Sequence, residues 1–129
     1  MIPQELIQDL EVLKEQGYAF EIIEDGVKIY IKFKDHPLPS GIYNKDKTDL
    51  LIFTTSHYPT AGFDMFWVDS NLALKNNGHP KAAETFENHL GMPWRRFSYH
   101  PYTATPWSPS EDSVIRFMSY VDKRLLMGD

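Results

Sequence analysis

The C-terminal segment, residues 108–125, constrains the fold more than any other part of this sequence. Its apolar side chains recur at i, i+3, i+4, i+7 and i+11, which is the spacing of one face of an α-helix. These side chains are Val114, Phe117, Met118, Val121 and Leu125. Ser108 suits the capping position, Pro109 the first helical position, and Glu111 completes a capping box, so the helix is predicted to begin at Ser108. Because this helix has one apolar face, the rest of the chain must offer a surface that buries it.

Antiparallel strands are the predicted partner of this helix. Asp25-Gly26 separates residues 18–24 from residues 27–33, and this dipeptide is a strong hairpin signal because both turn positions need positive φ. Residues 27–33 alternate between an apolar and a more polar set, which predicts one buried and one solvated face: Val27, Ile29, Ile31 and Phe33 against Lys28, Tyr30 and Lys32. Residues 50–53 and 65–68 are further apolar runs. The four segments together predict a four-stranded antiparallel meander.

A second helix is predicted near the N-terminus. Leu6, Leu10 and Leu13 recur at helical spacing. Gly17 is placed to end this helix in a left-handed conformation. Residues 82–90 are predicted as a further, short helix.

Length and composition limit the classes of fold and function. A chain of 129 residues fits one domain, so we predict a single α+β domain over residues 1–129. The formal charge is −5, with 18 acidic against 13 basic residues, which argues against nucleic-acid binding. No stretch approaches the roughly 18 apolar residues of a membrane span, and no signal peptide is recognisable, so the cytoplasm is the expected location. The five histidines are scattered, so neither a metal nor another cofactor is expected.

Four short motifs follow one another along the chain. Tyr58-Pro59 lies between the predicted third and fourth strands, and Trp107-Ser108-Pro109 opens the last helix. Between them stand residues 63–67 (Phe-Asp-Met-Phe-Trp) and 94–100 (Trp-Arg-Arg-Phe-Ser-Tyr-His). In this order the motifs resemble the ubiquitin-conjugating (UBC) superfamily, in a divergent bacterial branch. The resemblance implies a UBC-like fold and, as partners, a ubiquitin-like protein and a ubiquitin-activating-type enzyme. Members of this branch are typically encoded beside these proteins and beside JAB-type peptidases.

The catalytic position of the family differs in this chain. The family's nucleophilic cysteine lies a little upstream of Trp-Ser-Pro, where this chain has residues 97–101, and the whole sequence contains no cysteine. The resemblance therefore suggests Ser98 or, second, Tyr99 as a hydroxyl nucleophile that carries the modifier as an oxyester, with His100 as its base. Asn71 matches the Asn of the family's His-Pro-Asn and would donate a hydrogen bond to the developing oxyanion.

A function from a different class stays open at this stage. A catalytically silent adaptor of the same fold would bind the activating enzyme or the ubiquitin-like protein without carrying it. Its candidate contact residues are Trp94, Arg95, Arg96, Tyr102 and Trp107, because Trp, Tyr and Arg dominate binding hot spots. The same aromatic residues could instead form a satellite core under an irregular segment. A third alternative is an unrelated small binding domain that shares only this topology.

Overall fold

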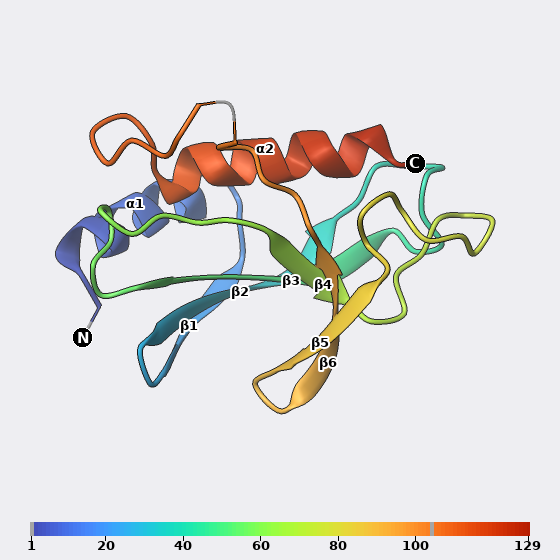
Figure 1. Cartoon of the computed structure of the whole chain (residues 1–129), viewed down its shortest axis with the longest axis horizontal. Coiled ribbons are helices and arrows are strands. Elements are labelled where there is room, and N and C mark those ends of the chain that lie inside the picture. The colour runs from blue at the N-terminus through green and yellow to red at the C-terminus, as the bar shows by residue number, and fades with distance from the viewer. Residues whose placement is uncertain (1, 104) are drawn as a thin grey trace.

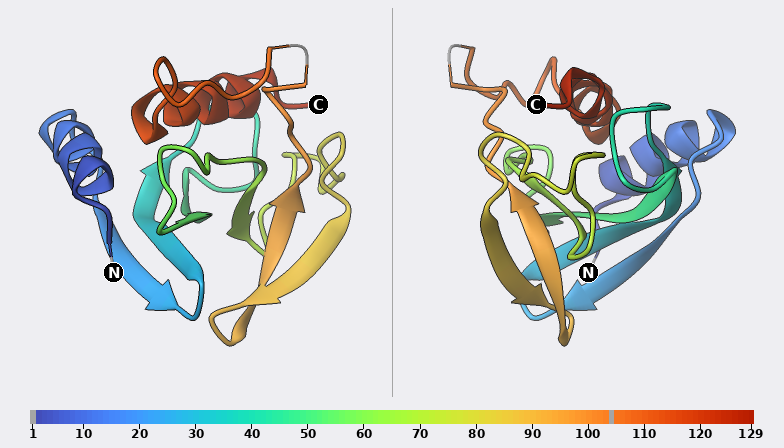
Figure 2. Two further views of the ribbon diagram at one scale, coloured as in Figure 1. Left: turned by 60° about the vertical axis from the view of Figure 1, so that its left-hand side comes forward. Right: turned by 90° about the vertical axis from the view of Figure 1, so that its right-hand side faces the viewer.

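The computed structural model describes residues 2–103 and 105–129, which form two helices and one six-stranded sheet (Figure 1). The elements in chain order are α1 (Gln4–Glu15), β1 (Phe20–Asp25), β2 (Lys28–Pro37), β3 (Lys47–Thr55), β4 (Phe66–Asp69), β5 (Thr85–His89), β6 (Met92–Phe97) and α2 (Val114–Met127). The strand order across the sheet is β1-β2-β3-β4-β6-β5, and all neighbouring strands are antiparallel. Both helices lie on the same side of the sheet, and α2 runs across it (Figure 2).

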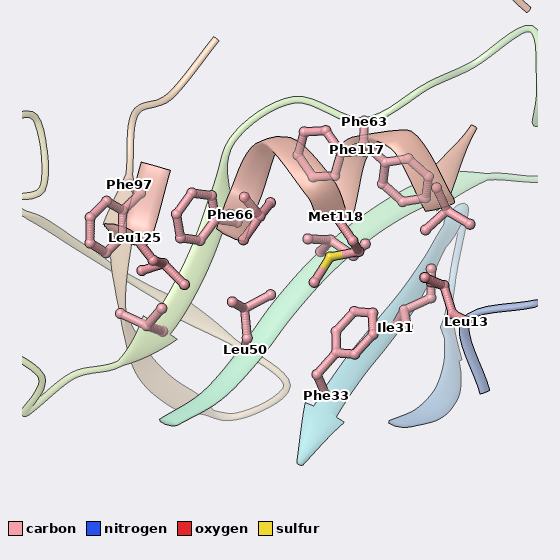
Figure 3. Packing of buried hydrophobic residues seen from close by; sticks show 14 of the residues in the cluster. Leu13, Ile31, Phe33, Leu50, Phe63, Phe66, Phe97, Phe117, Met118 and Leu125 are labelled. Carbon is pink, nitrogen blue, oxygen red and sulfur yellow. The ribbon is translucent and has the colours of Figure 1, made fainter. Parts of the chain in front are cut away.

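The main core lies between the sheet and the two helices (Figure 3). The apolar stripe predicted for the last helix is confirmed, because all five of its members are buried there: Val114, Phe117, Met118, Val121 and Leu125. On the sheet side, Phe66 of β4 and Phe97 of β6 stack with ring centroids 4.7 Å apart. Burial of one large apolar side chain contributes about 1.5–3 kcal/mol, so this stripe is sufficient to hold α2 on the sheet.

The prediction of an N-terminal helix is also confirmed. Leu6, Leu10 and Leu13 of α1 are buried in the main core. Gly17 follows the helix with a φ of +97°, the left-handed conformation expected of it. Neither of the helices in the described part of the chain has the length and apolar character needed to cross a bilayer.

The first hairpin is confirmed, but its turn lies one residue later than predicted. Asp25 is the last residue of β1 and pairs with Lys28, so the turn consists of Gly26 and Val27. Of these two, only Gly26 has a positive φ, +62°. Val27 is 81% exposed and does not share the buried face of β2.

The opposite face of the sheet carries a second, smaller core, where a solvated face was predicted. Its buried members are Tyr30, Leu51, Trp67 and Trp94. Phe53 stacks on Trp67 with centroids 5.3 Å apart, and Lys28 and Lys32 lie over neighbouring rings with their ammonium groups. Lys28 and Lys32 are therefore partly buried, and Tyr30 between them is buried in one cluster with a tryptophan from β4 and another from β6.

The prediction of four strands and of a helix at residues 82–90 is wrong, because β5 and β6 form an additional hairpin. Leu90 and Gly91 make its turn, both with positive φ, +55° and +78°. Two residues with positive φ suit the right-handed twist of a hairpin. Pairing with β6 and the hydrogen bond from Trp67 Nε1 to Glu87 fix residues 85–89 as a strand, against their helix propensity.

The predicted capping box at Ser108 is also wrong. α2 begins at Val114, and the Oγ of Ser113 accepts from the backbone N–H of Arg116 at 3.3 Å. The hydroxyl of Tyr58 accepts from the backbone N–H of Val114 at 3.0 Å and donates to Asp9 at 2.7 Å, so it ties the first turn of α2 to α1. The Ser108 N–H instead donates to the carboxylate of Asp112 in a turn that precedes the helix.

Candidate functional site

The segment in which the resemblance leads us to expect the catalytic position, residues 98–101, follows the end of β6. The backbone N–H of Ser98 donates to the carbonyl of Ala82 at 2.9 Å. The N–H of Tyr99 donates to the carbonyl of Phe97 at 2.8 Å, which closes a three-residue turn centred on Ser98. Because this turn interrupts the strand, the side-chain alternation of a regular strand does not place Ser98 and His100 on one face.

The hydroxyl of Ser98 is held by a charged network on the outer face of the sheet. Its Oγ accepts from Nε of Arg96 at 3.0 Å, and Nη1 of Arg96 donates to Oε2 of Glu87 at 2.7 Å. Oε1 of Glu87 accepts from Nε1 of Trp67 at 2.9 Å and lies 3.2 Å from Nε2 of His89. Burial alone raises the pKa of Glu87, but the bonds from Trp67, His89 and Arg96 outweigh it and leave that pKa below its ordinary value.

The imidazole of His100 pairs with a carboxylate and not with a hydroxyl of the same segment. Nδ1 of His100 lies 2.8 Å from Oδ2 of Asp64, and the two side chains are 47% and 54% exposed. A carboxylate only accepts, so Nδ1 carries a proton, and in the neutral form of the ring Nε2 has a free lone pair. An imidazole oriented in this way can act as a general base toward a group brought to it from solution.

His100 and Asp64 lie at the edge of an open cavity of about 580 Å³. Its walls come from the end of β3, the loop that precedes β4, and the segment that follows β6, with Phe63, Tyr102 and Trp107 among the lining residues. We call this cavity the Trp107 cavity.

Tyr99 packs into the molecule. Its ring meets Phe66 of the main core edge to face, with centroids 6.4 Å apart. Burial raises the pKa of the Tyr99 hydroxyl. A phenol whose ionisation is made harder is a poorer nucleophile near neutral pH.

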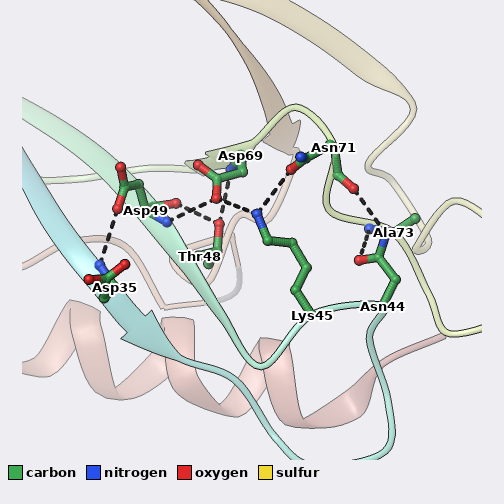
Figure 4. A network of polar contacts seen from close by, with 8 residues as sticks. All are labelled: Asp35, Asn44, Lys45, Thr48, Asp49, Asp69, Asn71 and Ala73. Carbon is green, nitrogen blue, oxygen red and sulfur yellow. Dashed lines mark hydrogen bonds and ion pairs between the residues drawn. The ribbon is translucent and has the colours of Figure 1, made fainter.

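Asn71 lies away from Ser98 and His100. Phe66 at the start of β4 pairs with Phe97, so Ser98 lies beside that end, whereas Asn71 follows the other end. β4, roughly 10 Å long at about 3.3 Å per residue, separates them. Oδ1 of Asn71 accepts from Nζ of Lys45 at 3.0 Å, and the same ammonium donates to Asp69 at 2.7 Å (Figure 4). These contacts fasten the loop after β4 to the loop before β3.

The expected partner-binding residues divide into buried and accessible ones. Trp94 is 0% exposed and donates from Nε1 to the carbonyl of His89, and Arg95 is 4% exposed and donates to the carbonyl of Ala83. Both side chains are thus used inside the molecule. Arg96, Tyr102 and Trp107 are partly exposed and keep surface for a partner.

Two of the sequence motifs meet at the Trp107 cavity. Nε1 of Trp107 donates to the carbonyl of Pro59 at 2.8 Å, and the indole packs on Gly62 so closely that a Cβ there would overlap the ring. The Tyr58-Pro59 peptide bond is cis. Asp64 and Gly62 could not be recognised from local signals, because their partners His100 and Trp107 lie 36 and 45 positions away.

A family model described as "Prokaryotic E2 family E" matches residues 6–127, which is nearly the whole chain. No curated protein and no solved structure matches the chain significantly.

Within residues 2–103 and 105–129, no three His, Asp or Glu side chains are grouped so that they could hold a metal ion.

Proposed function

Since the chain belongs to the prokaryotic E2 family E, a bacterial branch of the ubiquitin-conjugating enzymes, we propose that it acts in a bacterial ubiquitin-like modification pathway as a non-covalent adaptor. It would bind the activating enzyme or the ubiquitin-like protein and hold it without forming an ester. The family implies these two partners in general. A JAB-type peptidase is a further proposed partner, and the cytoplasm is the proposed location.

One observation carries this proposal: the hydroxyl nearest the family's catalytic position is bonded to a cation and not to a base. Ser98 accepts from Arg96, while His100 pairs with Asp64. An unassisted serine is a weak nucleophile, because its proton must be removed as it attacks. The sequence contains no cysteine, and the Ser98 hydroxyl is bonded to Arg96, which supports a role without an ester.

The proposed contact surface is the rim of the Trp107 cavity. His100 and Asp64 supply half-exposed polar groups, and Tyr102 and Trp107 supply partly exposed aromatic surface beside them. Partner surfaces of this kind combine a central aromatic anchor with a polar rim.

Isothermal titration calorimetry with the cognate activating enzyme and with the ubiquitin-like protein tests the adaptor. We expect the wild type to bind at least one of them, and a His100→Ala, Asp64→Asn variant to bind at least about ten-fold more weakly. His57→Ala is the matched control, because His57 is an exposed histidine that does not line the Trp107 cavity. If the wild type binds neither partner, or if the control weakens binding as much, the adaptor proposal fails.

A second candidate function is an oxyester carrier. The hydrogen bond from Arg96 to Ser98 would favour it if the guanidinium stabilises the ionised form of the serine. Because Oγ of Ser98 accepts from the guanidinium of Arg96, its own proton is free to leave, and the cation would stabilise the alkoxide. The oxygen would attack the thioester carbonyl on the activating enzyme, the serine proton would pass to His100 or to water, and the sulfur would leave as a thiolate. A hydroxylamine-sensitive adduct that disappears in a Ser98→Ala, Tyr99→Phe variant is the expected sign of this reaction.

A further inference from the structure

A second cavity of about 460 Å³ shares no lining residue with the Trp107 cavity. It opens between the segment after α1, the end of β2 and the C-terminal half of α2. Ligand pockets of proteins typically measure about 300–1,000 Å³, so the size is suitable for a small molecule or one long side chain. We call it the Asp122 cavity, after the carboxylate that lies in it.

Three polar side chains from three elements converge on this cavity. The hydroxyl of Tyr18 donates to Oδ2 of Asp122 at 2.8 Å, and Nε2 of His36 lies 2.7 Å from Oδ1 of Asp122. The rings of Tyr18 and His36 stack with centroids 5.7 Å apart. His36 is 4% exposed, whereas the Asp122 side chain is 42% exposed, so the imidazole forms the floor and the carboxylate reaches the opening.

The hydrogen-bonding sites of Asp122 that remain unused are acceptors and not donors. Burial and the bond to Asp122 raise the pKa of Tyr18. The phenol therefore stays protonated and donates its hydrogen bond to the carboxylate. Nε2 of His36 likewise donates to Asp122, since a carboxylate only accepts. Each oxygen of Asp122 receives one hydrogen bond from this pair and can accept about one more. A bound group must therefore donate.

The walls of the Asp122 cavity are largely apolar. Pro37, Pro39, Leu125 and Leu126 line it, and Leu126 is 64% exposed. One cation, Lys34, and a second carboxylate, Asp35, also line it. A negative group beside apolar walls suits an alkyl chain that ends in a positive group, because the chain covers the walls while the head pairs with the carboxylate.

We propose that the Asp122 cavity binds a primary alkylammonium group, with its nitrogen on the carboxylate of Asp122 and its chain along Pro37, Leu125 and Leu126. The ligand is either a free amine or the side chain of a lysine, which share this chemistry. The site does not depend on the adaptor function, because it uses none of the residues of the Trp107 cavity.

Titration of the full chain with n-pentylammonium, followed by NMR or calorimetry, tests the site. n-Pentanol and pentanoate are matched neutral and anionic probes. We expect only the ammonium to bind, Asp122→Asn to weaken it at least about ten-fold, and Lys34→Gln to strengthen it, because a competing cation is removed. Asp25→Asn, which changes the same charge at the far end of β1, should leave binding unchanged.

Additional variants and probes distinguish loss of the Asp122 charge from loss of folding, and they identify the source of the amine. Tyr18→Phe removes a hydrogen bond to Asp122 but keeps the carboxylate, so it should retain binding. If Asp122→Asn does not fold, Lys34→Gln and the three probes still decide the question. Tighter binding of Nα-acetyl-lysine methylamide than of pentylammonium would indicate a lysine side chain, and equal binding a free amine. Equal binding of pentanol or pentanoate, or unchanged binding in a folded Asp122→Asn variant, would overturn the proposal.

Discussion

Replacing Gly62 by alanine should destabilise the protein through a single contact with Trp107. A Cβ at Gly62 would lie 2.2 Å from Cδ2, 2.4 Å from Cε2 and 2.7 Å from Cε3 of the indole. The ring must then move by roughly 1 Å to restore ordinary carbon–carbon distances. Overpacking of this kind costs about 1–3 kcal/mol. The movement also breaks or weakens the 2.8 Å bond from Nε1 to Pro59, worth about 0.5–1.5 kcal/mol. We expect the free energy of unfolding to fall by about 2–4 kcal/mol.

A double-mutant cycle with Trp107→Ala isolates this contact. Without the indole the overlap disappears, since the three nearest atoms all belong to Trp107. The backbone at Gly62 does not have a positive φ, so alanine should then stabilise the protein by about 0.4–1 kcal/mol by restricting the unfolded chain. Urea unfolding followed by circular dichroism gives the four free energies. If Gly62→Ala costs the same with and without Trp107, the reasoning is refuted.

The hydrogen bonds of Glu87 and Tyr43 should each make stability depend on pH. Glu87→Gln removes the acceptor of Trp67 and Arg96. The folded-state pKa of Glu87 lies below its ordinary 4.5. The ionised carboxylate therefore stabilises the wild type above pH 4.5, and this stabilisation is lost as the pH falls below that value. The urea midpoint of the variant should depend less on pH in this range. Tyr43→Phe removes the 2.7 Å bond to the carbonyl of Leu125 and should cost about 1–3 kcal/mol at neutral pH. Burial raises the pKa of Tyr43 to about 12, so its contribution is complete below pH 10 and disappears as the pH approaches 12. Equal slopes of stability against pH for wild type and variant would contradict either assignment.

The elements that the sequence predicted are those whose signals are local. The stripe of α2 and the Asp25-Gly26 hairpin each depend on residues within a few positions of one another. The start of α2 was misplaced because its cap depends partly on Tyr58, whose hydroxyl reaches Val114 from another part of the chain. A plausible local capping box at Ser108 could not reveal that contact.

The β5–β6 hairpin could not be predicted from the chain alone. Its turn places Leu90 in a conformation that leucine seldom adopts, so Gly91 is the only local sign of a turn. Its partners lie on β4, which pairs with β6 and supplies the bond from Trp67 to Glu87. Long-range pairing therefore overrides the helix propensity of residues 82–90.

The sequence proposed residues for a site but not the groups that they contact. Ser98, Tyr99 and His100 do form an irregular segment beside an open cavity. The carboxylate that orients His100 comes from Asp64, 36 positions away, and the cation on Ser98 comes from its own neighbour Arg96. Asn71 was placed beside this segment by motif matching, whereas its own contacts are with Lys45 at the other end of β4.

Mass spectrometry of one reaction mixture tests the central claim most directly. The chain is incubated with the activating enzyme, ATP and the ubiquitin-like protein, and the mixture is measured under native and then under denaturing conditions. An adaptor predicts a complex in the native spectrum and, after denaturation, only the unmodified 15.0 kDa chain. A denatured chain heavier by the mass of the modifier less one water, returned to 15.0 kDa by hydroxylamine, would contradict the adaptor.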